Sequence, residues 1–565
     1  MFTFRNKNIS FQFSNGDLRH IILNGTIIIQ RVYFAVRDEV WLNIEPLFQN
    51  FSSSVVGCTT IYSFDLLFQK NSVNLTVHLI IRINTDDRKF QIDARGIALS
   101  DFKKNRIGLC LHLPSSLKGS PCDILHSDGS TSSTKLPILI SPHQPIQNIG
   151  QMELKTDHLT AKFVFEGDLF EMEDQRNWTD ASYKIYSTPL EFPFPVEVKK
   201  GDLFHQKISV TISPVAQIVK YPQLGDLSYK RVINSLPLFG TIIPDNFPLE
   251  YFNYIFNSGR FPFSYLRIDF HLYRNYWEEK IRKHIAFAKE KNIPIYAILY
   301  FSEHYENEMK DFLSFYNKLD LHDCLRYVVL LSSIDFVLPD SILGELIPRL
   351  RTNFSGIRIG TGTDANFAQL NRDRPSTKEF DFLCYAIHPQ EHASDMLSII
   401  ENIKGQSDTV VTAQSFANSK PIHISSLSLF RRFNANVEKI KSDNRIDNYP
   451  FAVSNFETGW FIGALNELIR VGIEAITAIF YPLDNSSLFI LFQKIANHPP
   501  EYFITDSLKT PMKYSMLSWQ SKGKIYSVIA NLTDDSLSLR HEKLSLKLAP
   551  HEIQYIENEI EYQGE

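Results

Sequence analysis

The fold is decided by residues 265–300, which read YLRIDFHLYRNYWEEKIRKHIAFAKEKNIPIYAILY. Tyr265–Phe270 is a short run rich in apolar residues, as in a buried strand, and Pro294–Tyr300 is a second run of this kind. Between them, apolar side chains recur every three or four positions from Trp277 to Ala288, which predicts an amphipathic helix. A strand, a helix and another strand in this order indicate a parallel sheet of the α/β kind.

The same alternation continues on both sides of this stretch. Further helical patterns include Met396–Ile403 and Phe461–Ile469. About eight strands that alternate with helices over roughly 260 residues predict a TIM-type (β/α)8 barrel. The other predicted strands are Leu238–Ile243, Tyr327–Leu331, Gly356–Gly360, Phe382–Ile387, Thr409–Ala413 and Ala475–Tyr481.

The residues that precede the barrel have the pattern of an antiparallel sheet. From Val73 to Ile83, apolar and polar side chains alternate with the period of two that marks a strand with one buried face. Phe90–Ala94 is the predicted antiparallel neighbour, after a polar turn at Asn84–Asp87. No amphipathic helix is evident before about residue 215, so this region is predicted to be a large β-sandwich.

Three domains are therefore expected in this chain of 565 residues. We predict an N-terminal β-sandwich over residues 1–215, the barrel over 216–495 and a small C-terminal β-domain over 496–565. The last domain is indicated by strand-like runs at Ile525–Ala530 and Leu544–Leu548. The predicted fold class is thus a multi-domain α/β plus β architecture.

Composition and charge argue against several classes of protein. The net charge is −5, and no basic stripe is evident, so no nucleic-acid partner is predicted. The five cysteines lack CxxC spacing, which fits neither a disulfide framework nor a zinc site and indicates a reducing compartment. No apolar run approaches the roughly 18 residues of a membrane span, and the N-terminus lacks a signal-peptide pattern. The expected location is the cytoplasm, with no membrane partner.

Two histidines follow the predicted sixth strand, Phe382–Ile387. Active sites of such barrels lie at the C-terminal ends of the strands, so polar residues just beyond each strand are candidate site residues. His388 and His392 flank a short turn there, and each could donate to an oxyanion or shuttle a proton near neutral pH. The alternative is that one caps backbone groups and the other faces solvent.

The loop after the predicted fifth strand is rich in amide and guanidinium groups. Asn366, Asn371, Arg372 and Arg374 could bind hydroxyls or a carboxylate, and Asp364 precedes them in the same loop. The alternative is a loop whose Asn and Asp side chains satisfy its own turns.

One segment is unusual for a β-sandwich. Eight of the fifteen residues in Phe170–Lys184 carry a charge or an amide, around the single Trp178. If the segment faces the barrel mouth, its carboxylates could activate water while Trp178 stacks on a sugar ring. The alternative is an exposed hairpin held by salt bridges. His143 and Gln144 form a similar but weaker pattern.

The chain resembles the D-apionate lactonase family from about residue 90 to residue 480. The run EMEDQRNWTDAS at Glu171–Ser182 is the most specific part of this resemblance. The other segments that carry it, in consistent order, are Asn105–Gly108, Ser141–Pro145, the loop after the fifth strand, His388–His392, Ser425–Asn434 and Gly459–Trp460.

The resemblance implies hydrolysis of D-apionolactone to D-apionate, in the breakdown of the branched pentose apiose. It implies a small sugar lactone as partner and no organic cofactor. No metal site is predicted, because the ligands of a metallohydrolase are not evident in the sequence. Lactone opening needs a base, donors for the oxyanion and an acid for the ring oxygen. We expect the base among Glu173, Asp174 and Asp180, and oxyanion or acid roles for His388, His392 and Arg176. The side chains expected to hold the substrate are His143, Gln144, Asn177, Trp178, Lys184, Asp364, Asn366, Asn371, Arg372 and Gln390.

The chain departs from the family pattern at two positions. The family carries Glu where this chain has Gln369, and a Glu after the eighth strand where this chain has Tyr481–Asn485. Asp484 and Glu457 are acidic residues that could replace them. If the family glutamates perform the chemistry, this chain is a divergent or impaired member.

Two other functions compete with the lactonase prediction. A glycoside hydrolase needs two carboxyl groups, roughly 5 Å apart if retaining and 6.5–9.5 Å if inverting. Many barrel glycosidases place Asn-Glu after strand four, whereas this chain has Ser332–Asp335 there, although Glu303 and Asp364 remain available. The second competitor is a non-catalytic sugar-binding relative, which the two missing glutamates suggest.

Overall fold

The structure is a computed structural model, and it divides into two compact units. The first comprises Met1–Arg176 and Ala181–Gln223, and the second comprises Asn177–Asp180 and Leu224–Glu565. Four residues from the middle of the first unit thus belong to the second. The residues that the structure describes are 2–6, 9–14, 16–23, 25–157, 159–214, 230–231, 236–243, 249–257, 261–431, 454–480, 486–505, 512–541 and 544–559.

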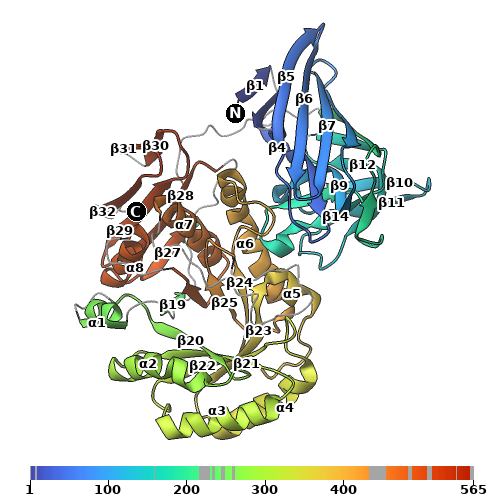
Figure 1. Ribbon diagram of the computed structural model, residues 1–565. Coiled ribbons are helices and arrows are strands. Elements are labelled where there is room, and N and C mark those ends of the chain that lie inside the picture. Colours follow the sequence, from blue (N-terminus) through green and yellow to red (C-terminus); the bar gives the residue numbers. More distant parts are fainter. Residues whose placement is uncertain are drawn as a thin grey trace. The chain divides into compact units, whose positions relative to one another are not determined.

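The first unit is an antiparallel β-structure whose two layers share one strand, drawn in blue to teal in Figure 1. One layer pairs in the order β1, β2, β3, β4, β9, β15, β14, and the other in the order β5, β6, β7, β8, β17, β13. Both layers reach β12, which pairs with β14 and with β13. The strands are β1 Phe2–Asn6, β2 Ile9–Ser14, β3 Asp17–Leu23, β4 Thr26–Asp38, β5 Leu47–Val56, β6 Thr59–Lys70, β7 Val73–Asn84, β8 Lys89–Ala98, β9 Phe102–Pro114, β10 Pro121–His126, β11 Thr131–Lys135, β12 Ile146–Lys155, β13 Leu159–Glu166, β14 Phe170–Asp174, β15 Ser182–Tyr186, β16 Val196–Val198 and β17 Leu203–Pro214.

Buried apolar side chains alternate with more exposed ones along the strands of this unit, as the sequence predicts. In β7 the residues with odd numbers, from Val73 to Ile83, are buried while their neighbours are more exposed. β7 pairs with β8 with Ile83 opposite Phe90, so the apolar faces of both strands lie on one side. These side chains join a single apolar core that includes residues from both layers. The prediction of an N-terminal domain of antiparallel strands is confirmed.

The second unit contains a closed barrel of eight parallel strands, β19 to β26. Figure 1 shows these strands with helices outside them. Most residues of the strands from β20 to β25 are buried, because a parallel sheet is covered on both faces. The prediction of a TIM-type barrel is confirmed. The strands are β19 Leu238–Ile242, β20 Tyr265–His271, β21 Ile295–Phe301, β22 Leu325–Ser332, β23 Arg358–Asn366, β24 Phe382–Ile387, β25 Ile422–Leu427 and β26 Ala475–Ala478.

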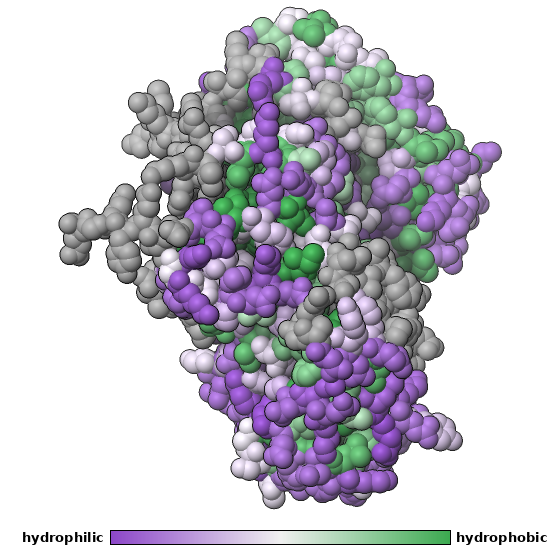
Figure 2. Space-filling model, turned by 90° about the vertical axis from the view of Figure 1, so that its left-hand side faces the viewer, coloured by the Kyte–Doolittle hydropathy of each residue, from purple (hydrophilic) through white to green (hydrophobic). Residues whose placement is uncertain are grey.

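The helices of this unit are amphipathic and follow the strands. In α2 the buried residues include Trp277, Ile281 and Ile285, and the opposite face carries charge. The outer surface at the bottom of Figure 2, where α2 to α4 lie, is accordingly mostly hydrophilic. The helices are α1 Leu249–Asn257, α2 Trp277–Glu290, α3 Tyr305–Leu319, α4 Asp340–Asn353, α5 Phe367–Arg372, α6 Met396–Phe416, α7 Asn455–Arg470 and α8 Ser487–Asn497.

The predicted seventh strand, Thr409–Ala413, is wrong. These residues belong to α6, which starts at the N-cap Asp395, and the seventh strand is β25, Ile422–Leu427. The run is rich in β-branched residues, which favour strands. Here tertiary packing decides instead, because Thr409, Val410 and Ala413 are buried in a helix that continues unbroken from Met396.

A small antiparallel sheet and a hairpin follow the barrel. The sheet pairs in the order β18, β27, β28, β29, β32, and β30 pairs with β31. The predicted runs Ile525–Ala530 and Leu544–Leu548 lie in β29 and β31, so a C-terminal β-region is confirmed. The strands are β18 Lys230–Arg231, β27 Tyr502–Thr505, β28 Tyr514–Ser521, β29 Lys524–Asn531, β30 Leu537–His541, β31 Leu544–Leu548 and β32 Ile553–Glu559.

Candidate active site

Two barrel strands lose register with β24 near their C-terminal ends. Gly362 of β23 faces Cys384, but the next paired residue, Asn366, already faces Ala386. On the other side of β24, β25 carries one extra residue between Ile424 and Ser426. Such bulges often lie beside active sites, where they redirect side chains. Together with the strand-end rule for these barrels, they point to the rim around β24 as the candidate site.

His392 and Asp180 form a hydrogen-bonded pair at this rim. His392 Nδ1 lies 2.6 Å from Asp180 Oδ2. Asn402 Nδ2 donates to the other carboxylate oxygen at 2.9 Å and also to the carbonyl of Pro389 at 2.9 Å. A carboxylate at Nδ1 places the ring proton on that nitrogen and leaves Nε2 as a proton acceptor. Nε2 has no hydrogen-bond partner among the residues that the structure describes, and the His392 side chain is 20% exposed.

The backbone that carries Asp180 is held in an unusual conformation. Thr179 has φ +69°, which is rare for a β-branched residue. Its Oγ1 donates to the carbonyl of His388 at 2.8 Å. On the other side, Gly405 of α6 packs against the same backbone, where a Cβ atom would lie 2.3 Å from the Thr179 carbonyl oxygen. Strained backbone of this kind persists where the surroundings fix it, and it concentrates at functional sites.

Trp178 and Asn177 connect this segment to the loop after the fifth strand. The Trp178 and His392 rings are nearly perpendicular, with their centroids 5.9 Å apart. The guanidinium carbon of Arg372 lies 5.2 Å from the centroid of the Trp178 ring. Asn371 Nδ2 donates to Asn177 Oδ1 at 2.8 Å. Trp178 is half-buried and Arg372 is exposed. The indole and the guanidinium thus border the surface beside the His392 ring.

His388 is buried and neutral. The backbone N–H of Gln390 donates to its Nδ1 at 3.3 Å, which places the ring proton on Nε2. Nε2 lies 3.5 Å from Glu391 Oε2. Burial, followed by the charge of Arg431, lowers the pKa of His388 to about 3. His388 can therefore donate a hydrogen bond near neutral pH without carrying a charge.

This buried histidine predicts a pH dependence of stability. The unfolded imidazole titrates near 6.5 and the folded one near 3, so between these values the unfolded state binds more protons. The contribution of His388 to the free energy of unfolding therefore has its full value above about pH 6.5 and decreases as the pH falls toward 3. In His388→Gln, which cannot titrate, the urea midpoint should fall less between pH 7 and pH 5 than in the wild type. Equal decreases in both proteins would contradict a buried neutral His388.

Glu391 is a buried carboxylate that the sequence analysis did not select. Asn366 Nδ2 donates to its Oε2 at 3.1 Å, and Arg431 Nη1 lies 3.8 Å from Oε1. The Glu391 side chain is 4% exposed, and burial raises the pKa of its carboxyl. Its position between the two histidines in sequence was a signal that could have identified it.

Asp364 lies beneath the rim in a buried ion-pair network. Arg267, which is fully buried, donates to both oxygens of Asp364 at 2.9 and 2.7 Å and also to Asp269. Tyr300 and Ser425 donate to the same Asp364 carboxylate at 2.9 and 2.8 Å. These donors engage both carboxylate oxygens, so the geometry favours a structural role over contact with a substrate.

Asp174 and Arg176 pair with each other inside the first unit. The guanidinium donates to both Asp174 oxygens at 2.8 and 2.7 Å, and both side chains are fully buried. Arg176 also donates to the carbonyls of Pro137 and Ile138, which fixes the nearby loop. Within the first unit, the positive charge of Arg176 neutralises the negative charge of Asp174.

The other predicted residues of the first unit lie around β14 and β15. Glu173 faces Lys184 across these two strands, and the Lys184 ammonium lies 5.3 Å from the centre of the Tyr186 ring. Gln144 Nε2 is 3.5 Å from the Tyr186 hydroxyl, and His143 is exposed. These residues form a polar group of their own within the first unit.

The structure also locates two further predicted positions. Gln390 Nε2 donates to the carbonyl of Leu429 at 2.8 Å. Gln369, where the family pattern has Glu, lies on α5 and is buried, and its Oε1 has no hydrogen-bond partner among the described residues. Tyr481–Asn485, the second departure from the family pattern, lies outside the described residues.

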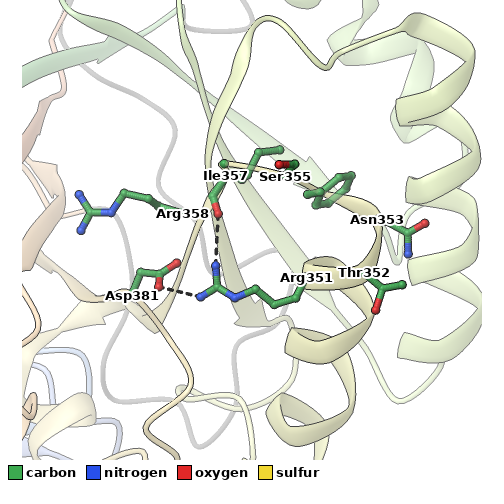
Figure 3. Close-up of a pocket in the computed structure, with 9 residues that line it drawn as sticks. Arg351, Thr352, Asn353, Ser355, Ile357, Arg358 and Asp381 are labelled. Carbon is green, nitrogen blue, oxygen red and sulfur yellow. Dashed lines mark hydrogen bonds and ion pairs between the residues drawn. The ribbon is translucent and has the colours of Figure 1, made fainter.

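A hollow lies at the N-terminal ends of the barrel strands, opposite the rim. It measures about 610 Å³ and is lined by residues 351–358 and Asp381, at the N-terminal ends of β23 and β24. Figure 3 shows the Arg351 guanidinium pointing to Asp381, with the ion pair at 2.7 Å, and to the carbonyl of Ile357. Since barrel active sites lie at the C-terminal ends of the strands, we do not place the chemistry in this hollow.

The described residues show neither a cluster of metal ligands nor a membrane-spanning helix. Within the ranges given above, no group of three or more His, Cys, Asp and Glu side chains is placed to hold a metal ion. No helix in the described part of the chain is long and apolar enough to cross a membrane.

Comparison with known proteins identifies the class and the family. The closed barrel of eight parallel strands makes this chain a TIM-barrel protein. Two family models match the chain: D-apionate lactonase, N-terminal domain, over residues 2–215, and D-apionate lactonase, TIM barrel domain, over residues 258–481. The chain belongs to the D-apionate lactonase family.

One curated relative and two solved structures illustrate the range of similarity. D-apionate lactonase from Brucella anthropi is 26% identical over 514 residues, covering 83% of this chain and 80% of the relative. A GH30 endoxylanase from Clostridium papyrosolvens has a TM-score of 0.37 at 8% identity, covering 59% of this chain and 99% of its own. A GH36 α-galactosidase from Geobacillus stearothermophilus has a TM-score of 0.30 at 10% identity, covering 98% and 99%. Structural similarity at these scores carries no argument about function.

Proposed function

We propose that this protein hydrolyses D-apionolactone to D-apionate in the breakdown of apiose. The observation that carries the proposal is the Asp180–His392 pair, in which a carboxylate holds Nδ1 and leaves Nε2 open at the rim. Membership of the D-apionate lactonase family and the activity named for the relative from Brucella anthropi support the substrate. A cytoplasmic location is part of the proposal, and the five cysteines, which form no disulfide bond, support it.

The pair acts as the base and then as the acid. His392 Nε2 takes a proton from a water molecule, and the water oxygen bonds to the carbonyl carbon of the lactone. Asp180 stabilises the imidazolium that forms. The tetrahedral intermediate then breaks the bond between this carbon and the ring oxygen, and the imidazolium returns its proton to that oxygen. The new carboxylic acid loses its own proton to solvent.

Asp180 is our choice among the three carboxylates expected to supply the base. Asp174 is paired with Arg176 and fully buried, and Glu173 lies opposite Lys184 in the first unit. Asp180 alone of the three is bonded to a histidine at the barrel rim. In this arrangement the carboxylate orients the base, and His392 accepts the proton from water.

The half-buried Trp178 is proposed as a platform for the sugar carbons. Its ring is held between the edge of His392 and the Arg372 guanidinium. Aromatic faces pack well on the apolar faces of sugars, and an exposed guanidinium suits hydroxyl or carboxylate recognition. We assign Arg372 to the carboxylate that forms when the ring opens.

The direct test is a pH-stat assay on D-apionolactone, corrected for spontaneous hydrolysis of the lactone. The wild type should consume base in proportion to enzyme concentration, and a chelator should leave the rate unchanged. A panel of aryl glycosides run in parallel should give no turnover. Thermal stabilisation by the lactone without base consumption would refute catalysis and favour a sugar-binding relative.

Gly405→Ala should displace the segment that carries Asp180. The added methyl group would lie 2.3 Å from the Thr179 carbonyl oxygen and 3.1 Å from the Asp180 carbonyl carbon, and backbone atoms cannot move aside cheaply. A displacement of about 1 Å can cost on the order of 10²-fold in rate, so kcat/KM should fall by about that factor. The control is Gly344→Ala in α4, where no described atom lies within 4 Å of the added carbon. If Gly405→Ala and Gly344→Ala are equally active, the position of the segment that carries Asp180 does not matter for catalysis.

A further inference from the structure

A small cavity lies between the two bulged strands at the rim. It is lined by residues of β23, β24 and β25 and by one residue just after each of the last two strands. Its volume of about 10 Å³ accommodates roughly one water-sized group. The lining residues are Asp364, Ala365, Asn366, Ala386, Ile387, His388, Ser426 and Ser428. A carbonyl oxygen is similar in size to a water molecule, so the cavity suits a single oxygen atom.

Ser426 is the lining residue with an uncommitted polar group. Its side chain is 1% exposed, and its Oγ has no hydrogen-bond partner among the described residues. The neighbouring hydroxyls differ, because Ser425 Oγ donates to Asp364 at 2.8 Å and Ser428 Oγ donates to the carbonyl of Phe430 at 2.7 Å. An unpaired buried hydroxyl costs free energy, so the protein retains one here against that cost.

The β25 bulge explains how Ser426 reaches the cavity. In regular pairing, residues on one face alternate, so Ser425 and Ser426 would lie on opposite faces of the strand. The extra residue between Ile424 and Ser426 breaks this alternation. Ser425 can then bond Asp364 while Ser426 lines the cavity next to His388.

We propose that this cavity binds the carbonyl oxygen of the lactone, with Ser426 Oγ as a hydrogen-bond donor to the oxyanion. This inference rests on the proposed function and names the residue that would stabilise its intermediate. His388 and Asn366 also line the cavity, but His388 Nε2 lies 3.5 Å from Glu391 Oε2 and Asn366 Nδ2 donates to the same oxygen. Asn366 already directs one proton to Glu391, and His388 is neutral, so neither brings a positive charge to the cavity.

The proposed step balances with the reaction given above. Attack by the water oxygen moves the carbonyl π electrons onto the carbonyl oxygen, which becomes negative while His392 holds the proton. Ser426 donates a hydrogen bond to this oxygen and transfers no proton. When the C–O ring bond breaks, the electrons return to form the carboxyl carbonyl. Donors placed where charge develops lower the barrier because they need no rearrangement.

Ser426→Ala tests the proposal by a split between kcat and KM. Loss of one oxyanion donor should lower kcat for D-apionolactone by about 10²- to 10³-fold and change KM by less than about threefold. The control is Ser515→Ala, which removes a buried hydroxyl that donates to the carbonyl of Gly459, outside the rim. This variant should keep the wild-type kcat. Circular dichroism and thermal midpoints verify that both variants fold.

The thionolactone analogue, in which sulfur replaces the carbonyl oxygen, identifies the contacted atom. Sulfur accepts hydrogen bonds poorly, so the wild type should prefer the oxygen substrate, and Ser426→Ala should lose most of this preference. The preference of the wild type can be measured even if the variant fails to fold. If the wild type prefers the oxygen lactone over the thionolactone no more strongly than hydroxide does in solution, the proposal is overturned.

Other outcomes separate this inference from the proposed function. If the wild type hydrolyses D-apionolactone and Ser426→Ala keeps its kcat, the oxyanion role is refuted and the function stands. A fall in kcat with an unchanged preference for oxygen over sulfur would make Ser426 a structural residue and refute the proposal. If the wild type does not hydrolyse D-apionolactone, the proposed function fails and the inference fails with it.

Discussion

Asp180→Asn is expected to lower kcat/KM for D-apionolactone by about 10²- to 10⁴-fold. Asn402 donates to one oxygen of Asp180, so an asparagine at position 180 would turn its carbonyl oxygen toward Asn402. Its amide N–H would then face His392 Nδ1, which would have to accept. The ring proton would move to Nε2, and the base would be lost although the shape of the site is retained.

The matched control is Asp395→Asn, in the same loop as His392. Asp395 caps α6 by accepting from the backbone N–H and hydroxyl of Ser398. Asparagine is an equally good N-cap residue, so this variant should keep both stability and activity. Steady-state kinetics of both variants from pH 6 to pH 9 would complete the comparison. If Asp180→Asn retains more than a tenth of the wild-type kcat/KM, another group must be the base.

Arg267→Met should lower the free energy of unfolding more than any of the other substitutions proposed for this protein. Arg267 is fully buried and pairs with Asp364, which is 1% exposed, and with Asp269. Methionine fills similar space but leaves the Asp364 carboxylate buried without its cation. Breaking a buried pair by removing one partner costs about 3–5 kcal/mol. We expect a loss of that order in the unfolding free energy of the barrel, measured by urea denaturation.

Arg282→Met provides the control for this prediction. Arg282 pairs with Glu278 one turn away on α2, and both side chains are well exposed, at 40% and 38%. Such pairs contribute about 0.3–0.5 kcal/mol, so the urea midpoint should hardly change. Similar losses in both variants would mean that the Arg267 network is solvated and contributes little.

The barrel was predictable because its elements are short and strongly patterned. Tyr265–Phe270, Trp277–Ala288 and Pro294–Tyr300 lie within β20, α2 and β21 or within one residue of them. The one misplaced strand, Thr409–Ala413, failed for a physical reason. Its β-branched residues fit a strand locally, and only burial against neighbouring elements shows that they belong to a helix.

That error had a consequence for the site. The predicted seventh strand ends before β25 begins, so the strand-end rule, applied to the sequence, does not point to Ser425 and Ser426 as rim residues. The two histidines after β24 were found because that strand was placed correctly. The hydrogen bond between Asp180 and His392 joins residues more than two hundred positions apart, and no periodicity in the sequence predicts such a pairing.

The assignment of Asn177–Asp180 to the second unit limits how this protein can be divided. Both flanks of the tetrapeptide are covalently part of the first unit, yet Asp180 is the carboxylate bonded to the barrel histidine. If this pair acts as proposed, a gene truncated to begin at the barrel would encode a protein that lacks one member of its acid–base pair. The leading domain could then not be exchanged, as an appended binding module can, without rebuilding the proposed catalytic centre.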